Sequence, residues 1–335
     1  MRDAIARVVA RESLSEREVE AVLRQIMQGV ATPAQIGGLL VALRMKGETV
    51  DEIVGAARAM RAHAVRVEPE RDDLVDTCGT GGDQRGTFNI STAAAFIAAG
   101  AGVSIAKHGN RAMSGVVGGA DVLEALGVKI ELEPARVTRC VDEGGIGFLF
   151  APVFHPAMRH ASGPRRELGV RTIFNLLGPL SNPAGARRQV VGVFAVEWIE
   201  PLARALGRLG AQHALVVHGA DGLDEISLAA PTQVAEWKDG ELTSYQVTPE
   251  ALGFNRCRPE DLVVQTREEA ASMIRGVLAD AAGPRRDIAV INAAAAIYVG
   301  GKAPTLVAGI RLAEESIRSG RARQKLEKMV ELTNR

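Results

Sequence analysis

Short apolar and β-branched runs alternate with helical stretches from Asp73 onward, and this alternation limits the fold more than any other feature of the chain. The strand candidates are DLVDT, GVSIAKH, GFLFAP, RQVVGVF and ALVVHG. The helix candidates between them cover residues 91–101, 119–127, 134–143, 156–169 and 199–209. Because buried strands that are joined through helices pair in parallel, we predict an α/β domain with a mainly parallel central sheet flanked by helices.

Two later segments depart from this alternation. VAEWKDGELTSYQV is typical of a β-hairpin that turns at Asp239 and Gly240, since Asp-Gly favours the tight turn between two antiparallel strands. The tail from Arg267 has a helical pattern, and we find no internal repeat or low-complexity segment.

The N-terminal residues carry three helix-start signals, in each of which a hydroxyl residue precedes Glu or Gln by three positions. These pairs are Ser15 with Glu18, Thr32 with Gln35, and Thr49 with Glu52. Gly29 and Gly47 stand where the preceding helices should end. We therefore predict a small all-helical domain over residues 1–70, completed by mid-chain helices around 160–185, beside a larger α/β domain over 71–335.

Charge and cysteine content exclude several classes of function. The chain has 40 Lys and Arg against 40 Asp and Glu, so it lacks the excess positive charge that nucleic-acid binding requires. Its three cysteines are scattered and fit neither a disulfide framework nor a zinc site. The N-terminus is charged throughout and no run reaches the ~20 apolar residues of a membrane helix. We expect a cytoplasmic protein with no nucleic-acid and no membrane partner.

A glycine-rich loop, CGTGGDQRGTFN, joins the first predicted strand to the helix that begins near Ser91. Such a turn leaves backbone N–H groups beside the positive end of a helix dipole, which suits a phosphate, although a tight turn with a hydroxyl cap would look similar. A Walker loop needs Lys after its last glycine, but Gly86 is followed by Thr87. A dinucleotide loop that began at Gly79 would have Gln84 in place of its last glycine, so spacing excludes both familiar phosphate loops.

Further polar groups follow two later strands. The segment AKHGNR ends the second predicted strand with cationic and amide donors, at the sheet edge where open α/β folds bind ligands. Gly118 and Gly119 then open another helix, which would offer N–H groups to an anion. Asp224 and Glu225 follow the strand ALVVHG and supply the hard oxygen ligands that Mg²⁺ prefers, although an isolated Asp-Glu pair is more often a solvated turn.

These motifs, in their order along the chain, resemble the anthranilate phosphoribosyltransferase family. The matching segments are GTGGD, FNIST, KHGNR, ADVLEALG, FAPxxHPAMRH, RRELGVRTIFNLLGPLSNPA, DGLDEIS and NAAAAIYV. The resemblance implies transfer of the 5-phosphoribosyl group from 5-phosphoribosyl-1-diphosphate (PRPP) to the amine of anthranilate in tryptophan biosynthesis. It also implies Mg²⁺ as cofactor, with two ions per active site, and a homodimer formed through the helical domain.

The resemblance also assigns site residues. It implies that PRPP is bound by Gly79, Gly82, Asp83, Thr87, Asn89, Ile90, Ser91, Thr92, Lys107, His108, Gly109, Asn110, Arg111, Ser114, Gly115 and Gly119. It implies anthranilate binding by Gly79, His108, Asn110 and Arg165, and metal binding by Ser91, Asp224 and Glu225. Lys107, Asp224 and Glu225 would be the catalytic residues. His155 would line the acceptor pocket, whereas Arg166 and Arg171 would form ion pairs or tie the two domains together.

One segment departs from the family pattern. The family commonly continues KHGNR with a serine-rich stretch of the form SVSSKSGSAD, whereas this chain has AMSGVVGGAD. Gly115 and Gly119 stand where serines are common, so side-chain phosphate contacts would be missing and we predict weaker PRPP binding.

Two other interpretations remain open. A pyrimidine nucleoside phosphorylase shares the short KH-G and Gly-Gly-x-Asp elements, but it would not need paired carboxylates for a metal. A non-catalytic nucleic-acid-binding relative should show a basic face and eroded loops, which the zero net charge and the intact motifs disfavour.

Overall fold

The computed structural model describes residues 1–112 and 117–335, so the predictions made for Ser114 and Gly115 lie outside the described residues. Its centre is a seven-stranded sheet with the order β3-β2-β1-β4-β5-β6-β7. The strands are β1 (Val75–Asp76), β2 (Ile105–Gly109), β3 (Ile146–Phe150), β4 (Arg188–Gly192), β5 (His213–Gly219), β6 (Thr232–Lys238) and β7 (Glu241–Val247). The first five pair in parallel, β6 pairs antiparallel with β5, and β7 pairs antiparallel with β6. The predicted α/β class with a mainly parallel sheet is confirmed.

The hairpin between β6 and β7 turns where the sequence predicts. Asp239 has φ 52° and Gly240 has φ 90°, which are the two positive values that a two-residue hairpin turn requires. Asp239 is therefore one of the few residues other than glycine that this chain holds in the left-handed region.

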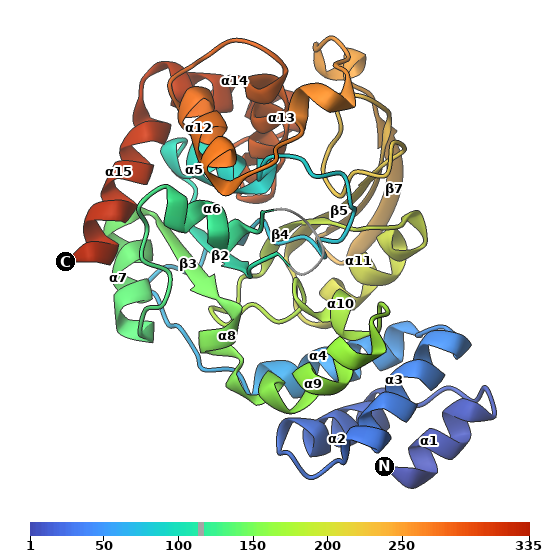
Figure 1. The fold of residues 1–335 in the computed structure, drawn as a ribbon. Helices are drawn as coiled ribbons and strands as arrows, with labels where there is room; N and C mark the ends of the chain where they lie inside the picture. The colour runs from blue at the N-terminus through green and yellow to red at the C-terminus, as the bar shows by residue number, and fades with distance from the viewer. Residues whose placement is uncertain (113–116) are drawn as a thin grey trace.

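Helices cover both faces of the sheet, because alternate residues of its central strands point to opposite sides. Val190 belongs to the core on one face and Val191 to the core on the other. The first core is covered by helices that pack on that face of the sheet (Figure 1), and the two of them over residues 90–100 and 284–299 are rich in alanine. These helices are α5 (Ile90–Gly100), α6 (Gly119–Ala125), α12 (Arg267–Leu278), α13 (Pro284–Val299), α14 (Leu306–Arg318) and α15 (Arg321–Asn334). Helix α7 (Pro134–Gly144) packs on β3, and α11 (Ile199–Arg208) covers the opposite face of β5 and β6.

The N-terminal helices form a bundle at the bottom of Figure 1. They are α1 (Arg2–Val9), α2 (Glu16–Met27), α3 (Pro33–Lys46) and α4 (Val50–Ala62). All three predicted start signals form complete capping boxes, at the beginnings of α2, α3 and α4. Gly29 and Gly47 both have positive φ, as glycines that end helices commonly do.

Mid-chain helices pack against this bundle. They are α8 (Ala151–Phe154), α9 (Arg159–Leu168) and α10 (Phe174–Leu177), with a 3-10 turn (Pro156–Met158) before α9. Helix α9 contacts α2 and α3, while α10 contacts α4. Ala161 and Phe174 share one apolar core with the N-terminal helices and with α11. Three further 3-10 turns lie at Val196–Trp198, Glu250–Leu252 and Pro259–Leu262. Among the described residues, no helix has the length and apolar character needed to cross a bilayer.

Candidate active site

The candidate site lies at the carboxyl ends of β1, β2, β4 and β5, which meet at one edge of the sheet because these strands are parallel. The glycine loop leaves β1 there, and the loop with Asp224 and Glu225 leaves β5. Residues that are more than a hundred positions apart in the chain therefore become neighbours. The backbone N–H of Ser91, at the start of α5, donates to Glu225 Oε1 at 3.1 Å.

Positive φ values shape the glycine loop. Gly81, Gly82 and Gly86 have φ 64°, 80° and 65°, and Gln84 has φ 60°. L-residues rarely adopt this region, so three glycines serve the turn itself. A hydrogen bond also attaches the loop to β4, because the Thr80 N–H donates to the Gly192 carbonyl at 2.8 Å.

Lys107 is a buried cation at the centre of the site. Its ammonium donates to the Thr77 carbonyl at 2.9 Å, to the Thr77 hydroxyl at 3.0 Å and to Ser91 Oγ at 3.2 Å. The side chain is 5% exposed, so solvent screens its charge little. The sequence placed Lys107 and Ser91 in one site, and the structure brings these two side chains into direct contact.

Three carboxylates gather beside this cation. Burial raises the pKa of Glu225 to about 7, with Asp83 adding to the rise and with Lys107 and the Ser91 N–H opposing it. Burial also raises the pKa of Asp224 well above its ordinary value, and the negative charges of Asp83 and Glu225 raise it further. Like charges held together in this way favour a bound cation or a proton.

A second group surrounds the short helix α10 and includes two of the predicted acceptor residues. His108 Nδ1 lies 3.0 Å from the Gly178 carbonyl, just after α10, and Arg165 lies over the Phe174 ring at 5.2 Å. Burial lowers the pKa of His108 to about 3 and that of His155 to about 4, so both imidazoles are neutral at physiological pH. Their ring centres are 5.0 Å apart, so His155 lies beside His108, and its place in the wall of the acceptor pocket stays a prediction.

Two buried oxygens of the predicted PRPP residues have no hydrogen-bond partner in the described parts of the chain. They are Asn89 Oδ1 and Thr92 Oγ1. Buried polar atoms normally find a partner, so these two are available to a ligand. Asn89 also links the two loops, because its Nδ2 donates to the Val117 carbonyl at 3.0 Å.

Other predicted residues serve the loops through their backbone or through packing. Ile90 is buried in the core, and Thr87 forms an isolated antiparallel bridge with Val263. A Cβ on Gly109 would lie 2.7 Å from the Phe148 ring, so the strand needs glycine there. A Cβ on Gly79 would lie 2.9 Å from the carbonyl oxygen of Gly192, which explains this glycine by close approach of two backbones.

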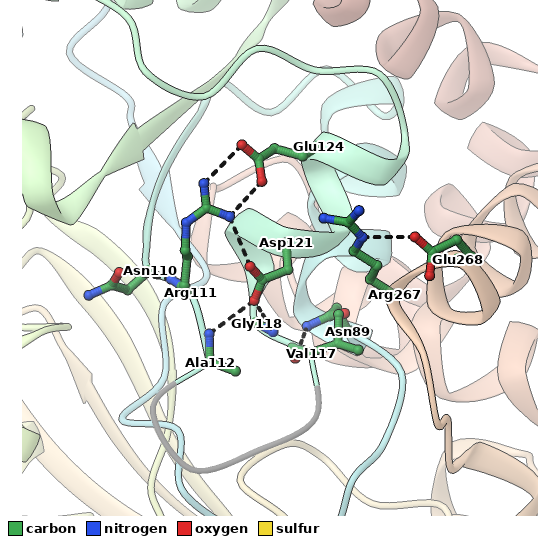
Figure 2. A network of polar contacts seen from close by, with 10 residues as sticks. All are labelled: Asn89, Asn110, Arg111, Ala112, Val117, Gly118, Asp121, Glu124, Arg267 and Glu268. Atoms are coloured by element: carbon green, nitrogen blue, oxygen red, sulfur yellow. Dashed lines mark hydrogen bonds and ion pairs between the residues drawn. The ribbon is translucent and has the colours of Figure 1, made fainter.

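Arg111 and Asn110 lie at the end of β2, in the network of Figure 2. The Arg111 guanidinium binds Glu124 at 2.5 and 2.9 Å and Asp121 at 3.0 Å. Its charge is thus already paired, although the sequence placed it with the phosphate ligands. Asn110 is exposed, and its Oδ1 accepts the Arg111 N–H at 2.8 Å.

Sequence reasoning missed three residues of this region, namely Gly192, Asp76 and Asn182. A Cβ on Gly192 would lie 1.5 Å from the Asp224 carbonyl oxygen, and a glycine inside the apolar run RQVVGVF was the signal that could have identified it. The buried Asp76 carboxylate accepts from the His108 N–H at 3.1 Å and from Asn182 Nδ2 at 2.8 Å, and burial raises its pKa to about 6.

Asp76 also lies close to Cys78 and His108, with their potential ligand atoms within 4.8 Å of one another. We assign no metal to this trio, because the Asp76 oxygens accept structural hydrogen bonds and His108 Nδ1 already faces a carbonyl. Burial also holds the pKa of the Cys78 thiol far above its ordinary value, which disfavours the thiolate that a metal needs.

Arg171 links the mid-chain helices to the glycine loop. Its guanidinium donates to the Gly82 carbonyl and stacks over the Phe194 ring at 4.3 Å. The contact ties the segment after α9 to the α/β domain, which is one of the two roles that the sequence left open for this residue.

Together, the fold and the site define a two-domain transferase for phosphorylated substrates, with a helical bundle beside an α/β domain. Comparison with known families agrees. Residues 71–323 match the glycosyl transferase family a/b domain and residues 2–64 match its helical bundle domain.

Relatives of known name narrow this class. The chain is 56% identical, over 99% of its length and 98% of the relative's, to the anthranilate phosphoribosyltransferase of Thioalkalivibrio sulfidiphilus. The crystal structure of the Thermus thermophilus enzyme of the same name superposes with a TM-score of 0.94 at 48% identity, covering 99% of this chain and 100% of that one. The Saccharomyces cerevisiae enzyme in complex with PRPP and Mg gives a TM-score of 0.90 at 28% identity, covering 99% and 97%. The chain therefore belongs to the anthranilate phosphoribosyltransferase family, as its sequence motifs indicate.

Proposed function

We propose that this protein transfers the 5-phosphoribosyl group of PRPP to the amine of anthranilate, giving N-(5-phosphoribosyl)anthranilate and pyrophosphate, in tryptophan biosynthesis. The observation that carries the proposal is the buried Lys107 ammonium. It bonds to Ser91, whose own N–H bonds to Glu225, beside a loop held open by glycines. A cation, hydroxyl groups and carboxylates at one sheet edge suit a polyanionic substrate that arrives with a divalent metal.

Backbone and hydroxyl groups would bind the PRPP. The glycine loop, from Gly79 to Gly86, lets the backbone approach the phosphates closely, and Asn89 Oδ1 and Thr92 Oγ1 are free to accept from the ribose hydroxyls. The other PRPP residues predicted from the sequence remain proposals. Arg111 is the exception, because its guanidinium is bound by two carboxylates.

The site's chemistry fits Mg²⁺. Asp224, Glu225 and Ser91 offer only oxygen ligands. Burial and neighbouring negative charge raise the pKa of both carboxyls although Lys107 opposes the rise for Glu225, so a divalent cation would stabilise their ionised forms. We propose that these three residues hold the metal, with two ions per active site. When bound, Mg²⁺ would supply positive charge to the pyrophosphate oxygens.

Arg165, Asn110 and the neutral His108 would bind the anthranilate. Burial lowers the pKa of Arg165 from its ordinary value, but the guanidinium remains charged and suits a planar carboxylate. A neutral His108 adds no positive charge that would compete for this carboxylate, and its ring presents an apolar face to the aromatic substrate.

The chain itself would act by position and by charge. Breaking the bond between ribose C1 and the pyrophosphate oxygen places negative charge on the leaving group, and Lys107 lies where it can stabilise that charge. Holding the anthranilate amine in line with C1 supplies the rest of the rate increase. The proposal requires no covalent intermediate with the protein.

The helical domain would form a homodimer. Val9 and Met45, on α1 and α3, are 68% and 71% exposed, so a second copy that covered them would bury apolar surface. All three cysteines are free, and this suits a cytoplasmic protein. We keep the domain division at residues 70 and 71 as part of the proposal.

One assay tests the function. Protein, PRPP, Mg²⁺ and anthranilate are mixed, and the fluorescence of anthranilate is followed. We expect its loss with the wild type, and no turnover with the double variant Asp224→Asn, Glu225→Gln at an unchanged circular dichroism spectrum. Turnover of a different aromatic amine, with none of anthranilate, would retain the chemistry and overturn the acceptor. Full activity of the double variant would overturn the metal assignment.

A further inference from the structure

The carboxylate of Asp121 organises the polar network of Figure 2, at the start of α6. Its Oδ2 accepts the N–H of Gly118 at 2.9 Å and the N–H of Ala112 at 3.1 Å. Its Oδ1 accepts from the Arg111 guanidinium at 3.0 Å. One side chain therefore joins the end of the β2 segment to the beginning of α6.

Close packing of two backbones accompanies these bonds. A Cβ on Gly118 would lie 2.3 Å from the Ala112 nitrogen and 2.5 Å from the Arg111 carbonyl carbon. Gly118 is thus needed for the two backbone segments to lie this close together. Asp121 holds them there, because its Oδ2 accepts hydrogen bonds from both N–H groups.

Two hydrogen bonds connect this junction to the substrate residues. The N–H of Ala120 donates to the Asn110 carbonyl at 3.2 Å, next to Gly118. The Val117 carbonyl accepts from Asn89 Nδ2 at 3.0 Å, which leaves Asn89 Oδ1 free for a ligand. The positions of Asn89 and Asn110 therefore depend on how α6 is attached to β2.

The charges of the network are arranged to hold Asp121 ionised. Burial raises the pKa of Asp121, but the N–H groups of Ala112 and Gly118 and the Arg111 guanidinium outweigh it, so this pKa lies below its ordinary value. Glu124 binds both terminal nitrogens of Arg111 and directs the guanidinium toward α6.

We propose that Asp121 is a positioning residue for PRPP, which acts through Asn89 and Asn110, and that Arg111 is its counter-ion and not a ligand of the phosphates. This inference rests on the proposed function. It assigns to the two carboxylates different tasks: Asp121 fixes backbone, whereas Glu124 only orients the arginine.

Electrostatics and positioning predict opposite results for one substitution. Asp121→Asn removes a negative charge beside a polyanionic substrate, which by charge alone would strengthen PRPP binding. Asparagine keeps one oxygen without its charge and turns the other into an NH2 donor that faces the Arg111 guanidinium, so the bonds to Gly118 and Ala112 would weaken and PRPP binding with them. Glu124→Gln removes the same charge from the same network but leaves both backbone bonds of Asp121 in place, so it is the matched control.

The experiment measures KM for PRPP and for anthranilate, kcat and the melting temperature of each variant. We expect Asp121→Asn to raise KM for PRPP about tenfold, as for a lost charge-assisted hydrogen bond, with KM for anthranilate changed less. Glu124→Gln should stay within about twofold of the wild type or bind PRPP more tightly. Equal effects of the two variants, or tighter PRPP binding by Asp121→Asn, would overturn the inference.

A second control separates stability from positioning. Glu18 also caps a helix, α2, by accepting the Ser15 N–H at 2.8 Å while it binds Arg7. Glu18→Gln should lower the melting temperature as Asp121→Asn does, without moving either KM. A matching rise in KM for PRPP in Glu18→Gln would show that general stability, and not the position of Asn89 and Asn110, is the cause.

A second variant and a binding measurement cover the cases in which the first experiment gives no result. If Asp121→Asn is unfolded at the assay temperature, Asp121→Glu keeps the charge and a capping carboxylate but displaces it, and KM for PRPP should still rise. A wild type without turnover would refute the proposed function. Pyrophosphate binding by calorimetry then tests the inference separately, and weaker binding in Asp121→Asn than in Glu124→Gln is the expected result. Equal affinities would overturn it.

Discussion

Gly192→Ala should disable the site while most of the fold survives. Gly192 ends β4, where its carbonyl accepts the Thr80 N–H at 2.8 Å and its Cα faces the loop of Asp224. An alanine Cβ there would lie 1.5 Å from the Asp224 carbonyl oxygen and 2.4 Å from the carbonyl carbon. The oxygen and carbon of Asp224 that would clash both belong to the backbone, so no change of side-chain rotamer relieves the contact.

The size of the effect follows from the geometry. Ordinary contact begins near 3.5 Å, so one backbone must move by about 2 Å. Overpacking of this kind typically costs about 1–3 kcal/mol of unfolding free energy, or a few degrees in melting temperature. A misplacement of about 1 Å in an active site can cost about 100-fold in rate, so we expect kcat/KM to fall at least that far.

Steady-state assays at several Mg²⁺ concentrations test this prediction, with Gly276→Ala as the matched control. Gly276 lies within α12, where a Cβ would stand 3.9 Å from Ala281 Cβ, so alanine should raise the unfolding free energy by about 0.5–1 kcal/mol and leave activity unchanged. Gly192→Ala should also need more Mg²⁺ for half-maximal rate, because Asp224 moves. Folded Gly192→Ala protein with kcat/KM and Mg²⁺ dependence within threefold of the wild type would refute the reasoning.

Three further predictions concern the substrates and pH. Gly119→Ser should lower KM for PRPP severalfold, because its Cβ would meet only Thr92 Oγ1 at 3.7 Å and its hydroxyl would restore a donor to the phosphates. An unchanged KM would contradict the prediction that the AMSGVVGGAD segment weakens PRPP binding. Arg165→Ala should raise KM for anthranilate about tenfold or more, and an effect confined to PRPP would show that Arg165 serves the other substrate. His155 has a pKa of about 4 in the folded protein because it is buried, so the unfolded chain binds more protons and stability falls as pH drops below about 6.5. Between pH 7 and 5 the unfolding free energy of the wild type should therefore fall by up to about 2 kcal/mol more than that of His155→Gln, as measured in urea titrations. Equal losses in the two proteins would exclude this histidine as a cause.

Local signals predicted the secondary structure well because they act over a few residues. Each of the three capping boxes needs only a hydroxyl and a carboxyl or amide group three positions apart, and each formed. The hairpin at Asp239 and Gly240 similarly depends on the backbone preferences of two residues. Strand runs that are buried on both faces are mostly apolar, so five of them could be recognised in the sequence.

The site was harder to predict, since its partners come from distant parts of the chain. Lys107 and Glu225 could be named by resemblance, but their link through Ser91 depends on how the carboxyl ends of β1, β2 and β5 meet. The pairing of Arg111 with Glu124 was missed, because an arginine beside a phosphate loop has the same sequence signature whether it binds phosphate or a carboxylate.

The sequence by itself determined the helix starts, the alternation of strands and helices, the family and the chemical types of the site residues. Tertiary structure alone decided which of those groups are paired and which are free. Gly192 shows the reason. This position must be glycine because a Cβ would clash with the carbonyl of Asp224, which lies 32 positions away in the sequence. Such contacts depend on the distance between two backbones, and no local pattern of residues encodes that distance.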